Sequence, residues 1–324
     1  MKEALFYTKL EDHKVRCDLC PHNCIIDSGQ IGLCKARKNI AGILYSINYG
    51  KTISISIDPM EKKPLYHFHP GKDIISIGPN SCNFSCKFCQ NYHSSQLEVP
   101  TINITPEDIL QQCRSNNCDF VAFTYTEPTT WFEFILDSSK LFKENGIKTV
   151  MVTNGYINQE PLKKLLPYID AMNIDLKSFD DKFYRSICNG TLQPVLETIK
   201  TASKQCHIEI TNLLITDEND TENIIIDLVD FVADVNPDIP LHFSRYYPTY
   251  KMKNPATPIS KLEMAKEIAE KKLKYVYLGN IITERNTYCP NCHHLLISRD
   301  YPIKNEIINA KCPSCGHEIY GEFS

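Results

Sequence analysis

Three cysteines stand close together near the end of the first quarter of the chain. Cys82, Cys86 and Cys89 lie in the run SCNFSCKFCQ with the spacing C-x-x-x-C-x-x-C. Soft thiolates select zinc, copper(I) or iron–sulfur clusters, and cubane clusters are normally held by cysteines. A four-iron cluster held by three thiolates would leave one iron open to a substrate or cofactor. A zinc knuckle that takes its fourth ligand from elsewhere in the chain is the alternative.

A second group of cysteines lies near the start of the chain, in CDLCPHNCIIDSGQIGLC. It consists of Cys17, Cys20, Cys24 and Cys34, with a proline and two glycines that can form tight turns between them. Four thiolates suit a closed tetrahedral zinc site. A second iron–sulfur cluster is the main alternative.

A third group lies near the end of the chain, in two C-x-x-C pairs. Cys289 and Cys292 form the first pair, and Cys312 and Cys315 form the second, nineteen residues later. This spacing predicts a zinc ribbon, with rubredoxin-like iron as the alternative. The tail is not markedly basic, which favours a structural or docking role over nucleic-acid binding. Four further cysteines fit ordinary packing positions: Cys113, Cys118, Cys188 and Cys206.

Length, charge and composition narrow the class of protein. The chain has 324 residues and a formal net charge of −4, so no broad basic surface for nucleic acid is expected. No apolar run reaches membrane-spanning length, and the start of the chain lacks a signal sequence, which predicts a cytoplasmic protein. Fifteen cysteines in short clusters indicate metal ligation rather than disulfides in a reducing compartment. The sequence also contains neither a G-x-G-x-x-G nor a complete G-x-x-x-x-G-K-[ST] phosphate loop.

Apolar strand-like segments alternate with helical segments from residue 73 onward. Thr105 followed by Pro106 predicts a capped helix start, and Ser260 with Glu263 predicts a capping box. Repeated β–α units predict a parallel sheet, as an open doubly wound sheet or as a barrel. The strands are expected to begin near six residues: Ile74, Phe120, Ile147, Ala171, His207 and Pro240.

Polar residues follow or occupy the expected strands. Ligands of parallel α/β proteins bind at the carboxyl ends of the strands, so we expect these side chains to converge on one face. Beyond the Cys82 loop, they are Thr124 to Pro128, Thr153 to Gly155, Asp175 to Lys177, Glu209 with Thr211 and Asn212, and His242 with Ser244 and Arg245.

The chain divides into three regions in this interpretation. Residues 1–72 hold the first cysteine group and a β-hairpin over residues 40–57 with its turn at Gly50. A proline-punctuated loop with two histidines, His67 and His69, follows, and metal binding by these two is not favoured. Residues 73–280 form the barrel-sized α/β domain, and residues 281–324 form the zinc-ribbon-like tail.

With these residues in place, the sequence resembles the radical S-adenosylmethionine (SAM) superfamily. Its cluster motif is C-x-x-x-C-x-x-C with an aromatic residue before the last cysteine, here Phe88. Within it, the chain resembles the pyruvate formate-lyase activating enzymes, and most closely the radical SAM component of the AmmeMemoRadiSam system. The resemblance covers nearly the whole chain and rests on CDLCPHNC, DPMEKKPLYHFHPG, CNFSCKFCQN, TYTEPT, VTNGY, DLKSF, LHFSRYYPTYKM, YVYLGN and the two CP-x-C pairs.

The resemblance implies a partial (β/α)6 barrel and a set of site residues. Cys82, Cys86 and Cys89 would ligate a [4Fe–4S] cluster whose open iron binds the amino and carboxylate groups of SAM. Glu127 would hold the methionyl amine, although Tyr125 and Thr126 replace the two glycines of the family's Gly-Gly-Glu motif. The remaining candidates are Asp175 and Lys177 beside the SAM carboxylate or the substrate, Asn154 at the ribose, and His242 and Arg245 as weaker SAM contacts.

The resemblance also implies a reaction. The reduced cluster would split SAM into methionine and a 5′-deoxyadenosyl radical, which takes a hydrogen atom from the substrate. A flavodoxin or ferredoxin would supply the electron. The substrate is either a glycyl residue of a partner enzyme, or a small molecule or other protein associated with Memo-like and AMMECR-like partners. A non-catalytic metal-binding module is the alternative from another class.

Overall fold

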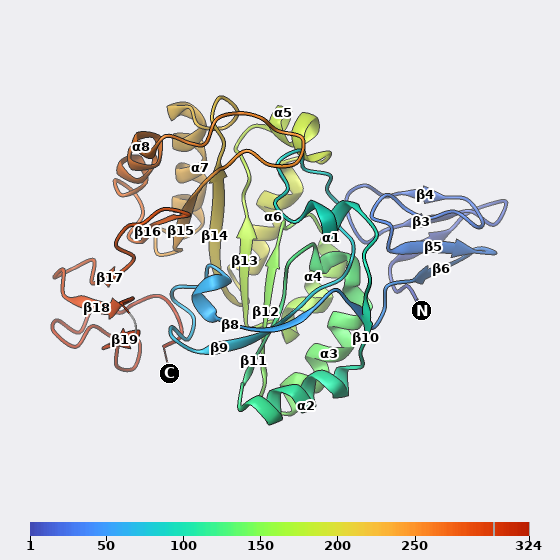
Figure 1. Cartoon of the computed structure of the whole chain (residues 1–324), viewed down its shortest axis with the longest axis horizontal. Helices are drawn as coiled ribbons and strands as arrows, with labels where there is room; N and C mark the ends of the chain where they lie inside the picture. Colours follow the sequence, from blue (N-terminus) through green and yellow to red (C-terminus); the bar gives the residue numbers. More distant parts are fainter. Residues whose placement is uncertain (301, 324) are drawn as a thin grey trace.

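The computed structural model describes residues 1–300 and 302–323. Its largest element is an eight-stranded curved sheet in the order β16-β15-β14-β13-β12-β11-β9-β8 (Figure 1). Seven of the strands are parallel, and β8 pairs antiparallel with β9 at one edge. The strands are β8 (Ile55–Pro59), β9 (Asp73–Ile77), β11 (Phe120–Phe123), β12 (Lys148–Thr153), β13 (Ala171–Asp175), β14 (His207–Leu214), β15 (Leu241–Arg245) and β16 (Val276–Gly279).

All six strands predicted from the sequence are present, each within one residue of its expected start. Their residues are mostly buried, as expected for parallel strands that are covered on both faces. The fold class is therefore confirmed as an α/β fold with a mostly parallel sheet and a cysteine-rich tail. The segment YVYLGN adds a seventh parallel strand, β16, and β8 joins the same sheet from the N-terminal region.

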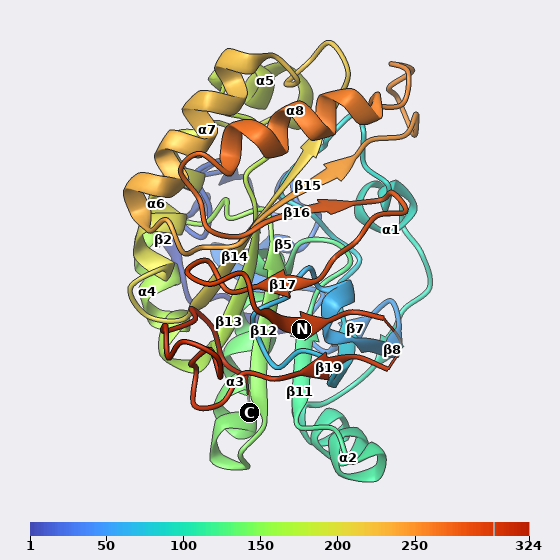
Figure 2. The same cartoon turned by 90° about the vertical axis from the view of Figure 1, so that its left-hand side faces the viewer.

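Helices connect the parallel strands and cover the outer face of the sheet (Figure 2). The helices α3, α6 and α8 each contact a neighbouring strand, while α7 packs on α8. They are α1 (Tyr92–Gln96), α2 (Pro106–Asn116), α3 (Phe132–Glu144), α4 (Gln159–Leu165), α5 (Asp181–Phe183), α6 (Gln193–Ala202), α7 (Glu222–Val235) and α8 (Ile259–Ala269). Within residues 1–300 and 302–323, no helix is long and apolar enough to cross a membrane.

One of the two predicted helix caps is confirmed. The Thr105 hydroxyl accepts a hydrogen bond from the Asp108 amide, and the Asp108 carboxylate accepts one from the Thr105 amide, which is a complete capping box. The box predicted at Ser260 is wrong. Helix α8 begins at Ile259 after Pro258, so Ser260 already has helical backbone and cannot act as the cap.

Small sheets flank the barrel on opposite sides (Figure 1). The first cysteine group lies among the N-terminal sheets β1-β6-β5 and β2-β3-β4, and the C-terminal sheet is β17-β18-β19. Their strands are β1 (Lys2–Glu3), β2 (Tyr7–Lys9), β3 (Val15–Cys17), β4 (Ile25–Ile26), β5 (Arg37–Ile40), β6 (Ile43–Ser46), β17 (Thr287–Tyr288), β18 (Leu295–Ser298) and β19 (Lys304–Asn305).

The hairpin predicted over residues 40–57 is wrong in its turn. The chain reverses at Ala41 and Gly42, both in the left-handed region, so β5 pairs with β6. At Gly50 the chain instead continues into β7 (Lys51–Thr52), which pairs with β10 (Ile102–Asn103). A Cβ at Gly50 would lie 2.7 Å from the Ile104 carbonyl oxygen, which explains the glycine.

Candidate functional site

The Cys82 loop leaves the carboxyl end of β9, as predicted, and is fixed from several sides. The Ser81 hydroxyl lies 2.6 Å from that of Thr130, and the Ser81 carbonyl accepts a hydrogen bond from the Glu127 amide. The Asn83 side chain donates to the Tyr156 carbonyl at 2.8 Å. These bonds attach the loop to segments that follow β11 and β12, so the loop has a defined place at the carboxyl end of the sheet.

The three cysteines of this loop differ in how readily they ionise. Burial raises the pKa of Cys82 and of Cys89. A hydrogen bond from the Cys188 thiol is the main cause that lowers the pKa of Cys86, and the Lys177 ammonium adds to it. Cys86 is therefore the thiol of this loop that loses its proton most easily.

Cys188 was not predicted to belong to this site. Its segment packs directly on the cysteine loop, because the Cys188 carbonyl accepts a hydrogen bond from the Ser85 amide and the Ile187 carbonyl accepts one from Lys87. A lone cysteine gave no signal for this position, since the segment reaches the loop only through the fold.

Asp175 and Lys177 lie beside the cysteine loop, as the sequence predicted. The Lys177 ammonium is 2.8 Å from the Asp175 carboxylate and 5.7 Å from the centre of the Phe88 ring. Burial alone would lower the pKa of Lys177, but Asp175, Cys86 and Cys188 raise it well above its ordinary value. Lys177 is therefore a permanent cation next to the cysteine sulfurs, able to attract a carboxylate.

Glu127 follows the end of β11, and both of its carboxylate oxygens accept hydrogen bonds from the protein. It accepts hydrogen bonds from the Thr129 amide at 2.8 Å, the Thr153 hydroxyl at 2.7 Å and the Asn154 amide at 2.8 Å. The residue is only 1% exposed. This geometry joins the ends of β11 and β12, and it does not present the carboxylate as an open site for an ammonium group.

Asn154 also faces the cysteine loop rather than an open pocket. Its side-chain amide donates to the Asn83 side chain at 2.9 Å and lies 4.0 Å from the Cys82 sulfur. Its carbonyl oxygen accepts a hydrogen bond from the Tyr156 amide at 2.9 Å. Asn154 is thus in a position to orient Cys82.

The backbone before Glu127 has a conformation that favours glycine. Tyr125 stands where the family motif has a glycine, yet its φ is 72°, a value that is costly for a residue with a bulky side chain. The end of the neighbouring strand β9 also lies very close to this backbone, because a Cβ at Gly78 would lie 2.1 Å from the Thr124 carbonyl oxygen. The chain therefore keeps a glycine-like backbone here without the glycines, and the Asn91 side chain holds the Tyr125 carbonyl at 2.6 Å.

Arg245 lies at the carboxyl end of β15, where it supports a long connection. Its side chain donates to the Thr257 carbonyl at 2.7 Å and to the Tyr247 hydroxyl at 3.1 Å. We call residues 246–258 the strap, because they cross the carboxyl end of the barrel (Figure 1). There the Tyr250 ring stacks on Tyr92 with ring centres 4.5 Å apart. The Lys251 amide also donates to the Lys87 carbonyl at 2.9 Å, so the strap contacts the cysteine loop.

Glu209 and His242 do not belong to this end of the barrel, and their predicted convergence with the other strand ends is wrong. The Glu209 carboxylate accepts hydrogen bonds from His242 at 2.6 Å and His207 at 3.2 Å, and from the His67 amide at 2.7 Å. Burial would raise the pKa of Glu209, but the two histidines lower it well below its ordinary range. The reason is position: His242 is the second residue of β15, whereas Arg245 is the last.

The loop histidines take part in this buried group. Burial lowers the pKa of His67 to about 3, so its ring is neutral near pH 7. Its Nδ1 lies 2.8 Å from the Tyr320 carbonyl and therefore carries the proton, while Nε2 accepts from the Tyr277 hydroxyl at 2.7 Å. His69 lies 3.3 Å from the Glu322 carboxylate. The loop thus attaches the C-terminal tail to the amino-terminal end of the barrel.

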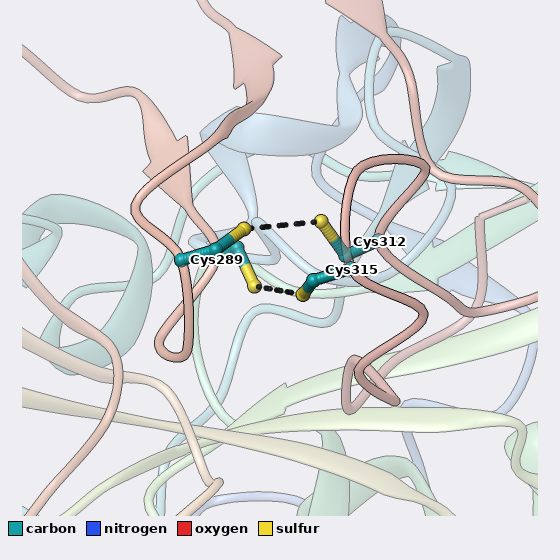
Figure 3. A group of neighbouring side chains, drawn as sticks. Cys289, Cys312 and Cys315 are labelled. Carbon is teal, nitrogen blue, oxygen red and sulfur yellow. Dashed lines mark hydrogen bonds between the residues drawn. The ribbon is translucent and has the colours of Figure 1, made fainter.

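The C-terminal cysteines form a compact four-sulfur group (Figure 3). All four sulfurs lie within 4.8 Å of one another, with Cys289 and Cys315 at 3.6 Å and Cys292 and Cys312 at 3.7 Å. These separations match tetrahedral thiolates about 2.3 Å from one zinc ion. A hydrogen bond from the Asn291 side chain is the main cause that lowers the pKa of Cys315 to about 6. The group could therefore bind a metal ion at neutral pH.

The two C-x-x-C segments of this group each have the same kind of backbone turn. The amides of Cys289 and Cys312 donate to the carbonyls of His294 and His317, and the amides of His293 and Gly316 donate back to the two cysteines. His293 and Gly316 both have positive φ. This repeat brings each C-x-x-C pair round a common centre.

The N-terminal cysteines have a wider arrangement. Cys17, Cys20, Cys24 and Cys34 line one pocket, but within the described residues they do not form a group whose sulfurs are gathered closely enough to hold a single metal ion. The structure therefore gives no support to the zinc site predicted for this group, which stays a prediction. Within the described residues, the three cysteines of the Cys82 loop likewise do not form such a group.

Comparisons with known proteins connect this geometry to a family. The model of the family described as "Radical SAM superfamily" matches residues 76–232. An uncharacterized protein of Methanocaldococcus jannaschii, MJ0808, is 48% identical over 98% of this chain and 99% of its own. The pyruvate formate-lyase-activating enzyme of Clostridium pasteurianum is 29% identical over 33% of this chain and 46% of its own.

A solved structure shares the fold. It is a radical SAM methyltransferase from Sphaerobacter thermophilus, which superimposes with a TM-score of 0.51 at 11% sequence identity and covers 65% of this chain and 67% of its own. At this level of identity the likeness concerns the arrangement of the strands and helices alone.

Proposed function

The chain belongs to the radical SAM superfamily, and on that premise we propose that Cys82, Cys86 and Cys89 hold a [4Fe–4S] cluster at which SAM is cleaved. The observation that carries this proposal is the position of the three thiols at the carboxyl end of the first parallel strand, with the Lys177 cation beside them. When bound, the cluster supplies one electron that splits the SAM sulfonium into methionine and a 5′-deoxyadenosyl radical.

The protein residues position the reactants around the loop. Lys177 is the group that would hold the SAM carboxylate, with Asp175 keeping the ammonium in place at 2.8 Å. Glu127 and Asn154 would act by fixing the backbone and orienting Cys82, because their polar atoms already contact protein groups. The strap would limit access of water to the radical, since it crosses the mouth of the barrel and contacts the loop.

Cleavage of SAM can be tested directly. Protein reconstituted under anaerobic conditions with ferrous iron and sulfide is mixed with dithionite and SAM, and 5′-deoxyadenosine and methionine are measured by mass spectrometry. We expect both products from the natural chain and from Cys113→Ala, which removes a buried thiol of α2 outside the site. Cys86→Ala should form neither. Equal product from Cys86→Ala and the natural chain would refute the proposal.

The proposed substrate is a glycyl residue of a partner enzyme, with flavodoxin or ferredoxin as electron donor. Its support is the partial similarity to a pyruvate formate-lyase-activating enzyme. The test adds candidate glycyl radical enzymes and SAM to the reduced protein and records electron paramagnetic resonance. A carbon-centred radical on the partner, absent with Cys86→Ala, supports activation. Its absence with every glycyl radical enzyme of the source genome would instead favour a substrate linked to Memo-like or AMMECR-like partners.

A further inference from the structure

The two four-cysteine groups use the same ligands at different separations. In the C-terminal group the sulfurs are gathered round one point, with contacts of 3.6 and 3.7 Å. The N-terminal cysteines are not among the groups of described residues whose ligand atoms lie closely enough together to hold a single metal ion. A single tetrahedral ion needs the first arrangement. A four-iron cubane binds each thiolate at a separate corner iron, so it needs the second.

A cavity lies between the N-terminal cysteines. Cys17, Cys20, Cys24 and Cys34 all line it. Apolar side chains such as Leu19 and Ile26 complete the wall. The four thiols therefore face a shared space, as the ligands of one multi-atom group would.

Arg37 supplies an independent sign of a missing partner. The residue is 1% exposed and lines the same cavity. Its guanidinium is 2.7 Å from the Glu133 carboxylate and 3.5 Å from the Thr130 carbonyl, but its Nε has no hydrogen-bond partner among the described residues. A buried N–H group without an acceptor is costly, and acceptors of this kind are usually supplied by a bound group when the protein offers none.

From these observations we infer that Cys17, Cys20, Cys24 and Cys34 hold a second iron–sulfur cluster of the four-iron type, and that the Arg37 Nε donates a hydrogen bond to one of its sulfurs. All four cysteines are used, so each iron of this cluster has a protein ligand. The N-terminal cluster is therefore coordinatively closed, in contrast to the cluster proposed at Cys82.

One residue, Asn83, belongs to the Cys82 loop and also lines the N-terminal cavity. Asn83 lines the cavity and directly follows Cys82 in the chain. The His22 ring, which lines the cavity as well, lies 2.8 Å from the Asn83 carbonyl. Two reduced clusters on either side of Asn83 would be close paramagnetic neighbours.

The test separates this inference from the proposed function by removing the Cys82 site. The triple variant Cys82→Ala, Cys86→Ala, Cys89→Ala is purified and reconstituted anaerobically with ferrous iron and sulfide, and iron, sulfide and zinc are measured. We expect about four irons and four sulfides per chain to remain, with a Mössbauer spectrum of a four-iron cluster. Zinc in place of iron at two equivalents per chain would overturn the inference.

A second variant tests whether a loss of iron comes from the loss of the ligands rather than from misfolding of the chain. Cys20→Ala with Cys24→Ala in the natural chain should lower iron from about eight to about four per chain, while the ion of the C-terminal group is kept as evidence that the chain is folded. Cys206→Ala is the matched control and should keep all the iron. Unchanged iron in the double variant would overturn the inference.

Magnetic resonance gives a third readout. The fully reduced natural chain should show line broadening from dipolar coupling between the two clusters. The broadening should be absent from both the triple and the double variant, each of which retains a single cluster. An unbroadened spectrum from natural chain that contains eight irons would contradict the placement of the two clusters around Asn83.

Discussion

The N-terminal and C-terminal cysteine groups contain the same four ligands and differ in the backbone that carries them. In the tail, two identical knuckles with left-handed residues at His293 and Gly316 turn four sulfurs onto one point. Near the start of the chain, the cysteines lie within a shorter segment, residues 17–34, around a cavity with a buried arginine. The comparison teaches that the number of cysteines predicts a metal site, whereas the geometry of the turns selects the kind of metal group.

The largest expected effect comes from breaking the compact group. Cys312→Ala should abolish binding of its ion, because structural zinc sites contribute roughly 10 to 16 kcal/mol of apparent binding free energy in small domains. Metal analysis should show one zinc fewer per chain with iron unchanged. Limited proteolysis should cleave within residues 287–323 and leave the barrel intact. Retained zinc together with an unchanged cleavage pattern would show that this group is not a structural ion site.

The second-largest expected effect is that exposure to air releases the metal of the N-terminal cysteine group but not that of the C-terminal group. In the triple variant that lacks the Cys82 site, controlled exposure should release the iron of the N-terminal group, because iron–sulfur clusters are oxidised whereas zinc has no redox chemistry. The C-terminal ion should remain bound. Parallel measurement of iron and zinc against time follows both groups in one sample. Loss of both metals at the same rate would mean that they share one chemistry.

The attachment of the C-terminal tail to the barrel should depend on pH. Because the pKa of His67 is about 3 in the folded chain and near 6.5 when unfolded, the unfolded chain binds one more proton between these values. Stability should therefore fall as pH drops from 6.5 towards 3, with a contribution from His67 of up to about 1.4 kcal/mol per pH unit. Urea unfolding at several pH values measures this slope.

The matched comparison uses His67→Gln and, as control, the same change at exposed His13. His67→Gln should be less stable at pH 7, because a buried ring and two hydrogen bonds are lost, yet it should have a shallower slope below pH 6.5. His13→Gln should keep the slope of the natural chain. An equal slope of stability against pH in all three proteins would show that His67 does not cause the pH dependence.

The smallest expected effect concerns the buried arginine. Arg37→Lys keeps a cation near Glu133 but lacks the Nε donor, so the reduction potential of the N-terminal cluster should become more negative by roughly 60 mV, the equivalent of one hydrogen bond of about 1.4 kcal/mol. Potentiometric titration of the triple variant measures it. The exposed Arg16→Lys should leave the potential unchanged, and an identical potential in Arg37→Lys would rule out a hydrogen bond from Nε.

Much of the barrel could be predicted from the sequence because its strands are buried on both faces. The runs after Asp73 and at Phe120 are nearly all apolar, and such runs are typical of parallel strands. Strands β8 and β16 were not assigned to the sheet, because the pairing of β8 with β9 and of β16 with β15 at the two edges depends on how the chain folds rather than on the local sequence. The capping box at Thr105 was identifiable because a favoured cap residue and a proline stand together.

Some residues of the site were predicted correctly from the sequence, and others were not. Lys177 and Asp175 lie where expected, because they directly follow a strand end. His242 and Glu209 were placed at the wrong end, since a strand rises about 3.3 Å per residue and the second or third residue of a strand lies far from its carboxyl end. Cys188 could not be predicted, because its contact with Cys86 depends on how a distant segment packs.

The group around Glu209 has a consequence for traffic through the barrel. Its amino-terminal end is filled by Glu209, His242 and His67, and the tail residue Tyr320 packs over them. We therefore expect molecules to reach the Cys82 loop from the carboxyl end of the barrel, which the strap crosses. When molecules reach a site from one side only, binding and release are ordered, because the molecule that binds last blocks the exit of the one that bound first. Nucleoside and amino acid products would thus depart only after the acceptor molecule has withdrawn.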